Sequence, residues 1–205
     1  MAGFVNKFYS LGYNVLAADA RAHGDSEGTK IGMGWPERFD VIEWIKLIIS
    51  WNSNAQIILH GVSMGAATVL MASGEELPEN VKAIIADCGY TSEWDEFKCE
   101  ANALHIPWFP VLNAASVMSR LRDGYDFKQA SALEQVKQSR IPTLFIHGSD
   151  DELVPYSMLD KLYSAAVCKK ECLTVNGAGH ALSSSVEPEL YWNTVESFIE
   201  KYLEK

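Results

Sequence analysis

Positively charged residues are scarce in this sequence of 205 residues. Seventeen lysines and arginines stand against 27 aspartates and glutamates, and the formal net charge is −10. Apart from Lys169 and Lys170 the basic residues are scattered, so no basic patch is available to bind the phosphates of a nucleic acid. The charge pattern therefore predicts no nucleic-acid partner.

Cysteines with metal-site spacing and long apolar runs are also lacking. Cys88, Cys99, Cys168 and Cys172 show no CxxC pair, and in a chain of this size we expect four reduced thiols. No apolar run approaches the ~20 residues of a membrane span. The N-terminus lacks the basic region of a signal peptide. These absences predict a cytoplasmic chain without a membrane segment.

The remaining composition, 48% hydrophobic and 21% charged, is typical of a globular protein, and we expect one domain over residues 1–205. Helix-like and strand-like runs alternate along it, which predicts an α/β fold with a mainly parallel sheet of about five strands flanked by helices. The expected strands are residues 13–18, 56–60, 81–87, 143–147 and 171–175. The expected helices are residues 4–11, 36–49, 64–73 and 188–203.

Residues 88–141 are too long for an ordinary connection between strands and too apolar for a linker. This segment is rich in aromatic residues and proline, above all at residues 106–110 (IPWFP). It predicts a helical lid inserted over one end of the sheet. An exposed apolar insertion would also suit a protein-binding surface, and that alternative stays open.

The sequence Gly61-Val62-Ser63-Met64-Gly65 lies between an expected buried strand and an expected helix. In this G-x-S-x-G pattern a tight strand-to-helix turn lifts the serine hydroxyl clear of the backbone, and small residues two positions away relieve the crowding. The N-terminus of the helix favours a developing negative charge nearby. Ser63 is therefore the candidate nucleophile, and the Met64 N–H is a candidate oxyanion donor.

Three further motifs, at residues 19–28 (DARAHGDSEG), 147–155 (HGSDDELVP) and 177–180 (GAGH), follow in a characteristic order. Together with the Ser63 motif they resemble the α/β-hydrolase superfamily, in particular its bacterial serine-aminopeptidase-like and prolyl-oligopeptidase-like branches. The resemblance implies Asp151 as the triad acid and His180 as the triad base. Asp150 competes with Asp151 for this assignment, and Asp87 is an outside candidate because some family members place their acid there.

The histidines support His180 as the base. A serine hydroxyl needs a base to take its proton, and a third group must orient that base. His60 and His147 end strands, where side chains usually pack, and His23 lies in a turn-rich loop that it would brace. His105 lies in the insertion, where a substrate-facing role stays open. His180 alone follows the last expected strand on a glycine-flexible loop.

The family resemblance also implies three strands before the helix expected at residues 4–11, and these are not part of this sequence. The loop after the third of them would supply a second oxyanion N–H, and losing one such donor typically costs ~10²–10³ in turnover. The sheet would also be left with an exposed inner edge, which recruits other chains. We therefore expect weak activity on simple activated esters, and either self-association through this edge or marginal stability.

Taken together, the motifs predict a serine hydrolase that cleaves an ester, or an amide or peptide bond, through an acyl-enzyme intermediate. The partner is a small-molecule ester or peptide substrate, and no metal or organic cofactor is implied. Acyltransfer or perhydrolysis on the same triad stays open. The alternative is a catalytically impaired hydrolase fragment that acts only as a binding module.

Overall fold

The computed structural model describes residues 2–203, which form two compact units divided between residues 31 and 32. The first unit contains helix α1 (Ala2–Ser10), which ends at Gly12 with a φ of 91°. The Phe8 and Tyr13 rings then meet edge to face, with centroids 6.1 Å apart.

The strand predicted at residues 13–18 is not formed, and this prediction is wrong. The residues are strand-like, but a strand exists only where a neighbouring strand binds its backbone N–H and C=O groups. Within residues 32–203, the described pairings join the four strands of the sheet only to one another. The pattern of apolar residues in this segment does not report whether a neighbouring strand is present.

The loop after this segment folds around Asp19. The Ser26 hydroxyl donates to the Asp19 carbonyl oxygen (2.7 Å), and the Asp25 N–H donates to the Asp19 carboxylate (3.2 Å). A Cβ on Gly24 would lie 2.1 Å from the same carboxylate and would displace it, and the φ of 52° also favours glycine there. The His23 ring lies 3.0 Å from the Arg21 carbonyl oxygen, which agrees with its expected role within this loop.

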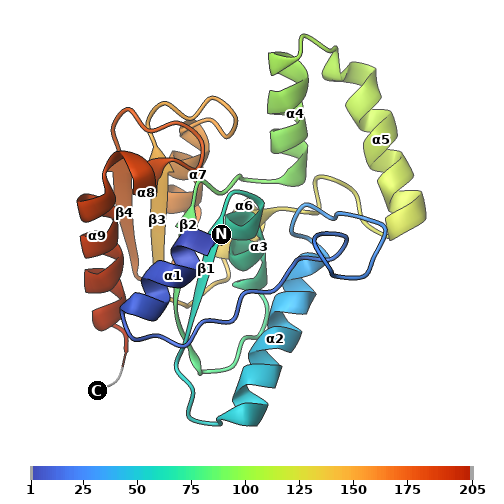
Figure 1. The fold of residues 1–205 in the computed structure, drawn as a ribbon. Coiled ribbons are helices and arrows are strands. Elements are labelled where there is room, and N and C mark those ends of the chain that lie inside the picture. Colours follow the sequence, from blue (N-terminus) through green and yellow to red (C-terminus); the bar gives the residue numbers. More distant parts are fainter. Residues whose placement is uncertain (1, 204–205) are drawn as a thin grey trace. The chain divides into compact units, whose positions relative to one another are not determined.

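The second unit is built on a parallel sheet, and Figure 1 shows its strands with helices around them. The described strands have the order β1-β2-β3-β4, and every pair is parallel. Four of the five predicted strands are therefore present, and the predicted fold class is confirmed. The strands are β1 (Ile57–Val62), β2 (Val81–Asp87), β3 (Thr143–Gly148) and β4 (Lys170–Val175).

Apolar side chains cover both faces of the sheet, as expected for parallel strands. Alternate residues of β2 and β3, including Ile84 and Phe145, join one core. The residues between them, including Ile85 and Ile146, are also fully buried and therefore face the other side. The first core is completed by α2 (Glu37–Trp51), α3 (Met64–Ala72), α6 (Ala132–Val136) and α7 (Ser157–Ala165).

The second face is covered by α9 (Pro188–Glu200), which follows the short helix α8 (Ser183–Val186). The buried residues of α9, Tyr191, Val195, Phe198 and Ile199, have the spacing of one helical stripe. Tyr191 contacts His60 of β1 and Asp87 of β2. This stripe therefore lies across the strand ends near the candidate site.

The segment between β2 and β3 contains α4 (Glu93–Ala103), α5 (Trp108–Asp123) and α6, and Figure 1 shows α4 and α5 as a helical hairpin. The Ser92 hydroxyl caps α4 by accepting the Asp95 N–H (3.1 Å). Large apolar side chains of α5, including Phe109 and Leu121, are exposed. The segment is helical as predicted, and its role as a lid stays a prediction. Among residues 2–203, no helix combines the length and the apolar character that a bilayer crossing requires.

Candidate active site

Ser63 lies on a strained turn between β1 and α3. Its φ of 55° and ψ of −118° are unusual for a residue with a side chain, and its N–H donates to the Asp87 carbonyl oxygen (2.9 Å). A Cβ on Gly61 would lie 2.2 Å from the Gly65 carbonyl oxygen, so the turn requires glycine at Gly61. This is the geometry expected of a nucleophile elbow. Met64 is the first residue of α3, where backbone N–H groups have no partner within the helix.

The structure brings the three residues singled out in the sequence together. The His180 Nε2 lies 2.8 Å from the Ser63 Oγ, and its Nδ1 lies 2.8 Å from the Asp151 Oδ2. His180 follows β4 on a loop that includes Gly177, with a φ of 74°. Asp151 follows β3, so all three residues lie at the carboxyl edge of the sheet.

The Asp151 carboxylate is held on both oxygens. Its Oδ1 accepts the N–H groups of Leu153 (3.1 Å) and Val154 (2.9 Å). Its Oδ2 faces His180 Nδ1 and lies 3.3 Å from the His147 Nε2. Burial alone would raise the pKa of Asp151, but hydrogen bonds from His147, His180 and Val154 hold it well below its usual range. The carboxylate is therefore ionised at neutral pH.

The pKa of His180 is raised above its ordinary value of 6.5, chiefly by the hydrogen bond to Asp151. Partial burial opposes this shift, and the negative charges of Glu96 and Asp87 add to it. The imidazolium that forms when the histidine takes a proton is thus stabilised by its surroundings.

The two other candidate acids have other hydrogen-bond partners. Asp150 is exposed and accepts the Ser149 hydroxyl (2.6 Å). Asp87 is buried and accepts the Tyr191 hydroxyl on its Oδ2 (3.0 Å). Burial raises the pKa of Asp87 to about 6, with the Tyr191 hydrogen bond opposing the shift.

The other histidines have separate surroundings. The His147 Nε2 donates to the Val154 carbonyl oxygen (2.9 Å) and also lies 3.3 Å from the Asp151 Oδ2. His147 therefore contacts the same carboxylate oxygen that faces His180. His60 lies 3.4 Å from the Tyr191 hydroxyl, and burial lowers its pKa to about 4. His105 lies at the exposed turn between α4 and α5.

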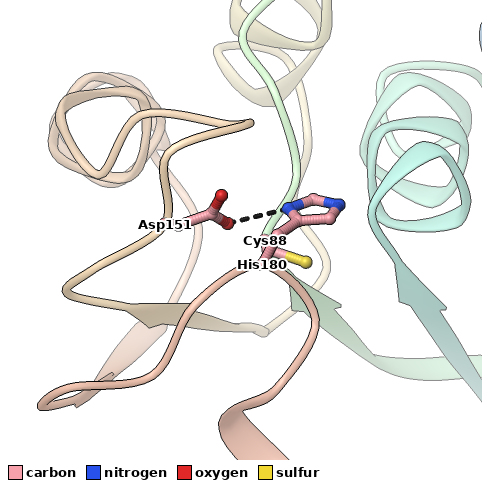
Figure 2. Close-up of side chains that lie close together, drawn as sticks. All are labelled: Cys88, Asp151 and His180. Carbon is pink, nitrogen blue, oxygen red and sulfur yellow. Dashed lines mark hydrogen bonds and ion pairs between the residues drawn. The ribbon is translucent and has the colours of Figure 1, made fainter.

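Sequence reasoning did not find Glu96 or Tyr191 and treated Cys88 only as a reduced thiol. All four cysteines are free, as expected. Cys88 directly follows β2, and Figure 2 shows its sulfur beside the His180 ring. The sulfur also lies within 4.8 Å of a carboxylate oxygen of Asp151. The sequence offered one indication that Cys88 lies near the candidate site: it comes one residue after a predicted strand, and such strands end at the edge where the site lies.

Comparisons with known proteins show the family to which the chain belongs. A model of the prolyl oligopeptidase family matches residues 6–205. The chain belongs to this family. It is 30% identical over 199 residues to the uncharacterized protein YqkD of Bacillus subtilis, covering 96% of this chain and 65% of that protein. It is 31% identical over 158 residues to lysophosphatidylserine lipase ABHD12 of Macaca fascicularis, covering 77% of this chain and 39% of the lipase.

Solved structures show that this member of the prolyl oligopeptidase family has an α/β-hydrolase fold. The Pyrococcus furiosus esterase Pf2001 is similar with a TM-score of 0.78 and 24% identity, over 98% of this chain and 76% of the esterase. The Pyrococcus horikoshii acylaminoacyl peptidase is similar with a TM-score of 0.62 and 17% identity, over 84% of this chain and 28% of the peptidase. The chain thus spans about 65% of the YqkD length and 39% of the ABHD12 length.

Proposed function

We propose that this chain is a serine hydrolase that transfers an acyl group to water through Ser63, His180 and Asp151. The observation that carries the proposal is the continuous hydrogen-bond chain from the Ser63 hydroxyl through His180 to Asp151, with 2.8 Å at each step. The elbow geometry of Ser63 and the ionised, doubly held Asp151 support it.

The reaction follows from this arrangement. The Ser63 Oγ attacks the substrate carbonyl carbon while the His180 Nε2 takes the hydroxyl proton. Asp151 keeps the proton on His180 Nδ1 and stabilises the imidazolium. The first turn of α3, with the Met64 N–H, offers a donor to the oxyanion. His180 then gives its proton to the leaving group. In the second half of the reaction water attacks the acyl carbonyl while His180 takes its proton, and His180 returns that proton to the Ser63 Oγ as the carboxylic acid leaves.

The substrate class we propose is a carboxylic ester, with amides and peptides as further candidates. Three of the four proteins named above are a lipase, an esterase and an acylaminoacyl peptidase, names that all describe cleavage next to an acyl carbonyl. The exposed apolar side chains of α5 support a lid over an apolar substrate, so residues 88–141 keep their expected role within this proposal. The expected cytoplasmic location also belongs to it, and four free thiols support that location.

Labelling with a fluorophosphonate, followed by peptide mapping, tests the proposal. The probe should label Ser63 alone, and the Ser63→Ala variant should lose the label while keeping the fold. Ser26 and Ser149, which lie in the neighbouring motifs, serve as internal controls. Modification of either of them, or no labelling of the folded protein, would contradict the proposal, and the second result favours the non-catalytic binding module.

Self-association through the edge of the sheet stays a prediction. Within the described strands, β1 pairs with β2 on one side and with no strand on the other. An unpaired strand edge can bind a strand of another chain. Light scattering should therefore detect oligomers whose mass rises with protein concentration, and a monomer at all concentrations would contradict it.

A further inference from the structure

Cys88 occupies a position that the proposed reaction does not use. It directly follows β2 with a φ of 48°, and its N–H donates to the Ile146 carbonyl oxygen of β3 (2.9 Å). The residue is 1% exposed. A cysteine held this firmly at the carboxyl edge of the sheet has little freedom to turn its sulfur away from the neighbouring side chains.

The neighbours of the sulfur are two side chains that bind metals. The Cys88 Sγ, one ring nitrogen of His180 and one carboxylate oxygen of Asp151 all lie within 4.8 Å of one another. Figure 2 shows His180 Nδ1 turned towards Asp151 and the Cys88 sulfur beside the His180 ring. Thiolate, imidazole and carboxylate bind Zn²⁺ at ~2.0–2.3 Å, which puts tetrahedral ligands about 3.3–3.8 Å apart. Side-chain shifts of about 1 Å would therefore close the set around an ion.

We infer that Cys88, His180 and Asp151 form an inhibitory site for thiophilic divalent cations such as Zn²⁺ and Cd²⁺. This inference rests on the proposed function for its inhibitory effect, but not for the binding itself. Three protein ligands leave the fourth tetrahedral position to water. The carboxyl groups of Asp87 and Glu96, which both act on His180, add to the attraction for a cation when they are ionised; burial raises the pKa of Glu96 to about 7.

Metal binding and catalysis exclude each other at this site. The Cys88 thiol releases a proton to solvent as its sulfur binds the ion. His180 binds through Nδ1, so its remaining proton lies on Nε2. That nitrogen can then no longer accept the Ser63 proton. Asp151 turns from His180 to the metal, and the base loses its orienting partner as well.

Without a metal, the sulfur does not disturb the triad. Burial raises the pKa of the Cys88 thiol far above its usual range, with the Asp87 charge adding to the shift. The thiol is therefore neutral and does not compete with Asp151 for the His180 proton. Because Cys88 is buried, an ion enters past His180, whose side chain is 21% exposed, and inhibition should develop slowly.

Ester hydrolysis by the whole chain in metal-free buffer, with added ZnCl₂ or CdCl₂, tests the site. Both ions should inhibit the wild type, and a chelator should restore its rate. The inhibition of Cys88→Ala is measured relative to its own metal-free rate. Its half-inhibitory concentration should rise at least about tenfold, because losing only a hydrogen-bond partner of a metal ligand already costs 10–100-fold in metal affinity. Mg²⁺, which prefers oxygen ligands, should not inhibit.

Cys172 offers a matched control because it is an exposed cysteine on β4. Cys172→Ala should remain as sensitive to Cd²⁺ as the wild type. Equal sensitivity of wild type and Cys88→Ala, or insensitivity of the wild type, would overturn the inference. If Cys88→Ala does not fold, Cys88→Ser serves as the test, since its oxygen replaces the soft sulfur ligand in a side chain of similar size.

A readout that does not depend on activity separates this inference from the proposed function. In a chain with Cys99, Cys168 and Cys172 replaced by alanine, Cys88 is the sole thiol. Titration with CdCl₂ should then produce the ultraviolet thiolate-to-cadmium band and saturate at one ion per chain. A band without phosphonate labelling would sink the proposed function alone. Labelling without a band would sink the metal site alone.

Discussion

Asp151→Asn is the most informative single change, because all the partners of the carboxylate are donors. Its Oδ1 accepts the N–H groups of Leu153 and Val154, and its Oδ2 faces ring nitrogens of His180 and His147. The His147 nitrogen carries a hydrogen, because the same atom donates to the Val154 carbonyl oxygen. An asparagine side chain has one acceptor, its carbonyl oxygen, and one donor group, its NH₂. In either orientation the NH₂ group therefore faces N–H groups that are also donors.

A change of the His180 tautomer removes the contact between the two donors at the lowest cost in free energy. With the NH₂ group of the asparagine on the His180 side, Nδ1 becomes an acceptor and the ring hydrogen moves to Nε2. His180 can then no longer take the proton of Ser63. In a Ser-His-Asp hydrolase this change lowers kcat about 10⁴-fold. At about 1.36 kcal/mol for each factor of ten, the loss of transition-state stabilisation is about 5.5 kcal/mol.

The assay is the saturating initial rate on an activated ester, with circular dichroism and thermal unfolding to verify the fold of each variant. Asp150→Asn is the matched control, since Asp150 is exposed and contacts Ser149 rather than His180. Its rate should stay close to that of the wild type, because Asp150 does not hydrogen-bond to His180 in the structure, and its free energy of unfolding should change by no more than about 0.5 kcal/mol. Equal losses in the two variants, or a larger loss in Asp150→Asn, would refute the reasoning.

Three further results are expected. The rate should rise with pH as His180 loses its proton, with a midpoint above the ordinary 6.5 because its pKa is raised; a midpoint below 6.5 would contradict this. Glu96→Gln should move that midpoint to lower pH, because the Glu96 charge raises the His180 pKa; an unmoved midpoint would count against the coupling. Tyr191→Phe should lower the free energy of unfolding in urea by about 1–3 kcal/mol, because it removes the hydroxyl that the buried Asp87 accepts. The loss should grow above pH 6, where Asp87 is ionised, and Tyr9→Phe at an exposed position should show no such loss.

Much of the fold was visible in the sequence because its strands are buried on both faces. Residues 81–87 and 143–148 are continuous apolar runs with few polar interruptions, and they form β2 and β3. Residues 13–18 have a similar appearance but form no strand. A strand depends on a neighbour that binds its backbone, and no local pattern reports whether that neighbour is present.

The sequence by itself determined the candidate residues Ser63, Asp151 and His180, because each lies in a short motif with a local backbone requirement. Their approach to 2.8 Å was decided by the tertiary structure, since parallel strands bring their carboxyl ends to one edge. Only the tertiary structure placed Cys88 beside His180 and Asp151. It also placed Glu96 where its charge acts on His180. These relations join residues far apart in the chain through burial and electrostatics, and both depend on distances in space that a linear pattern does not contain.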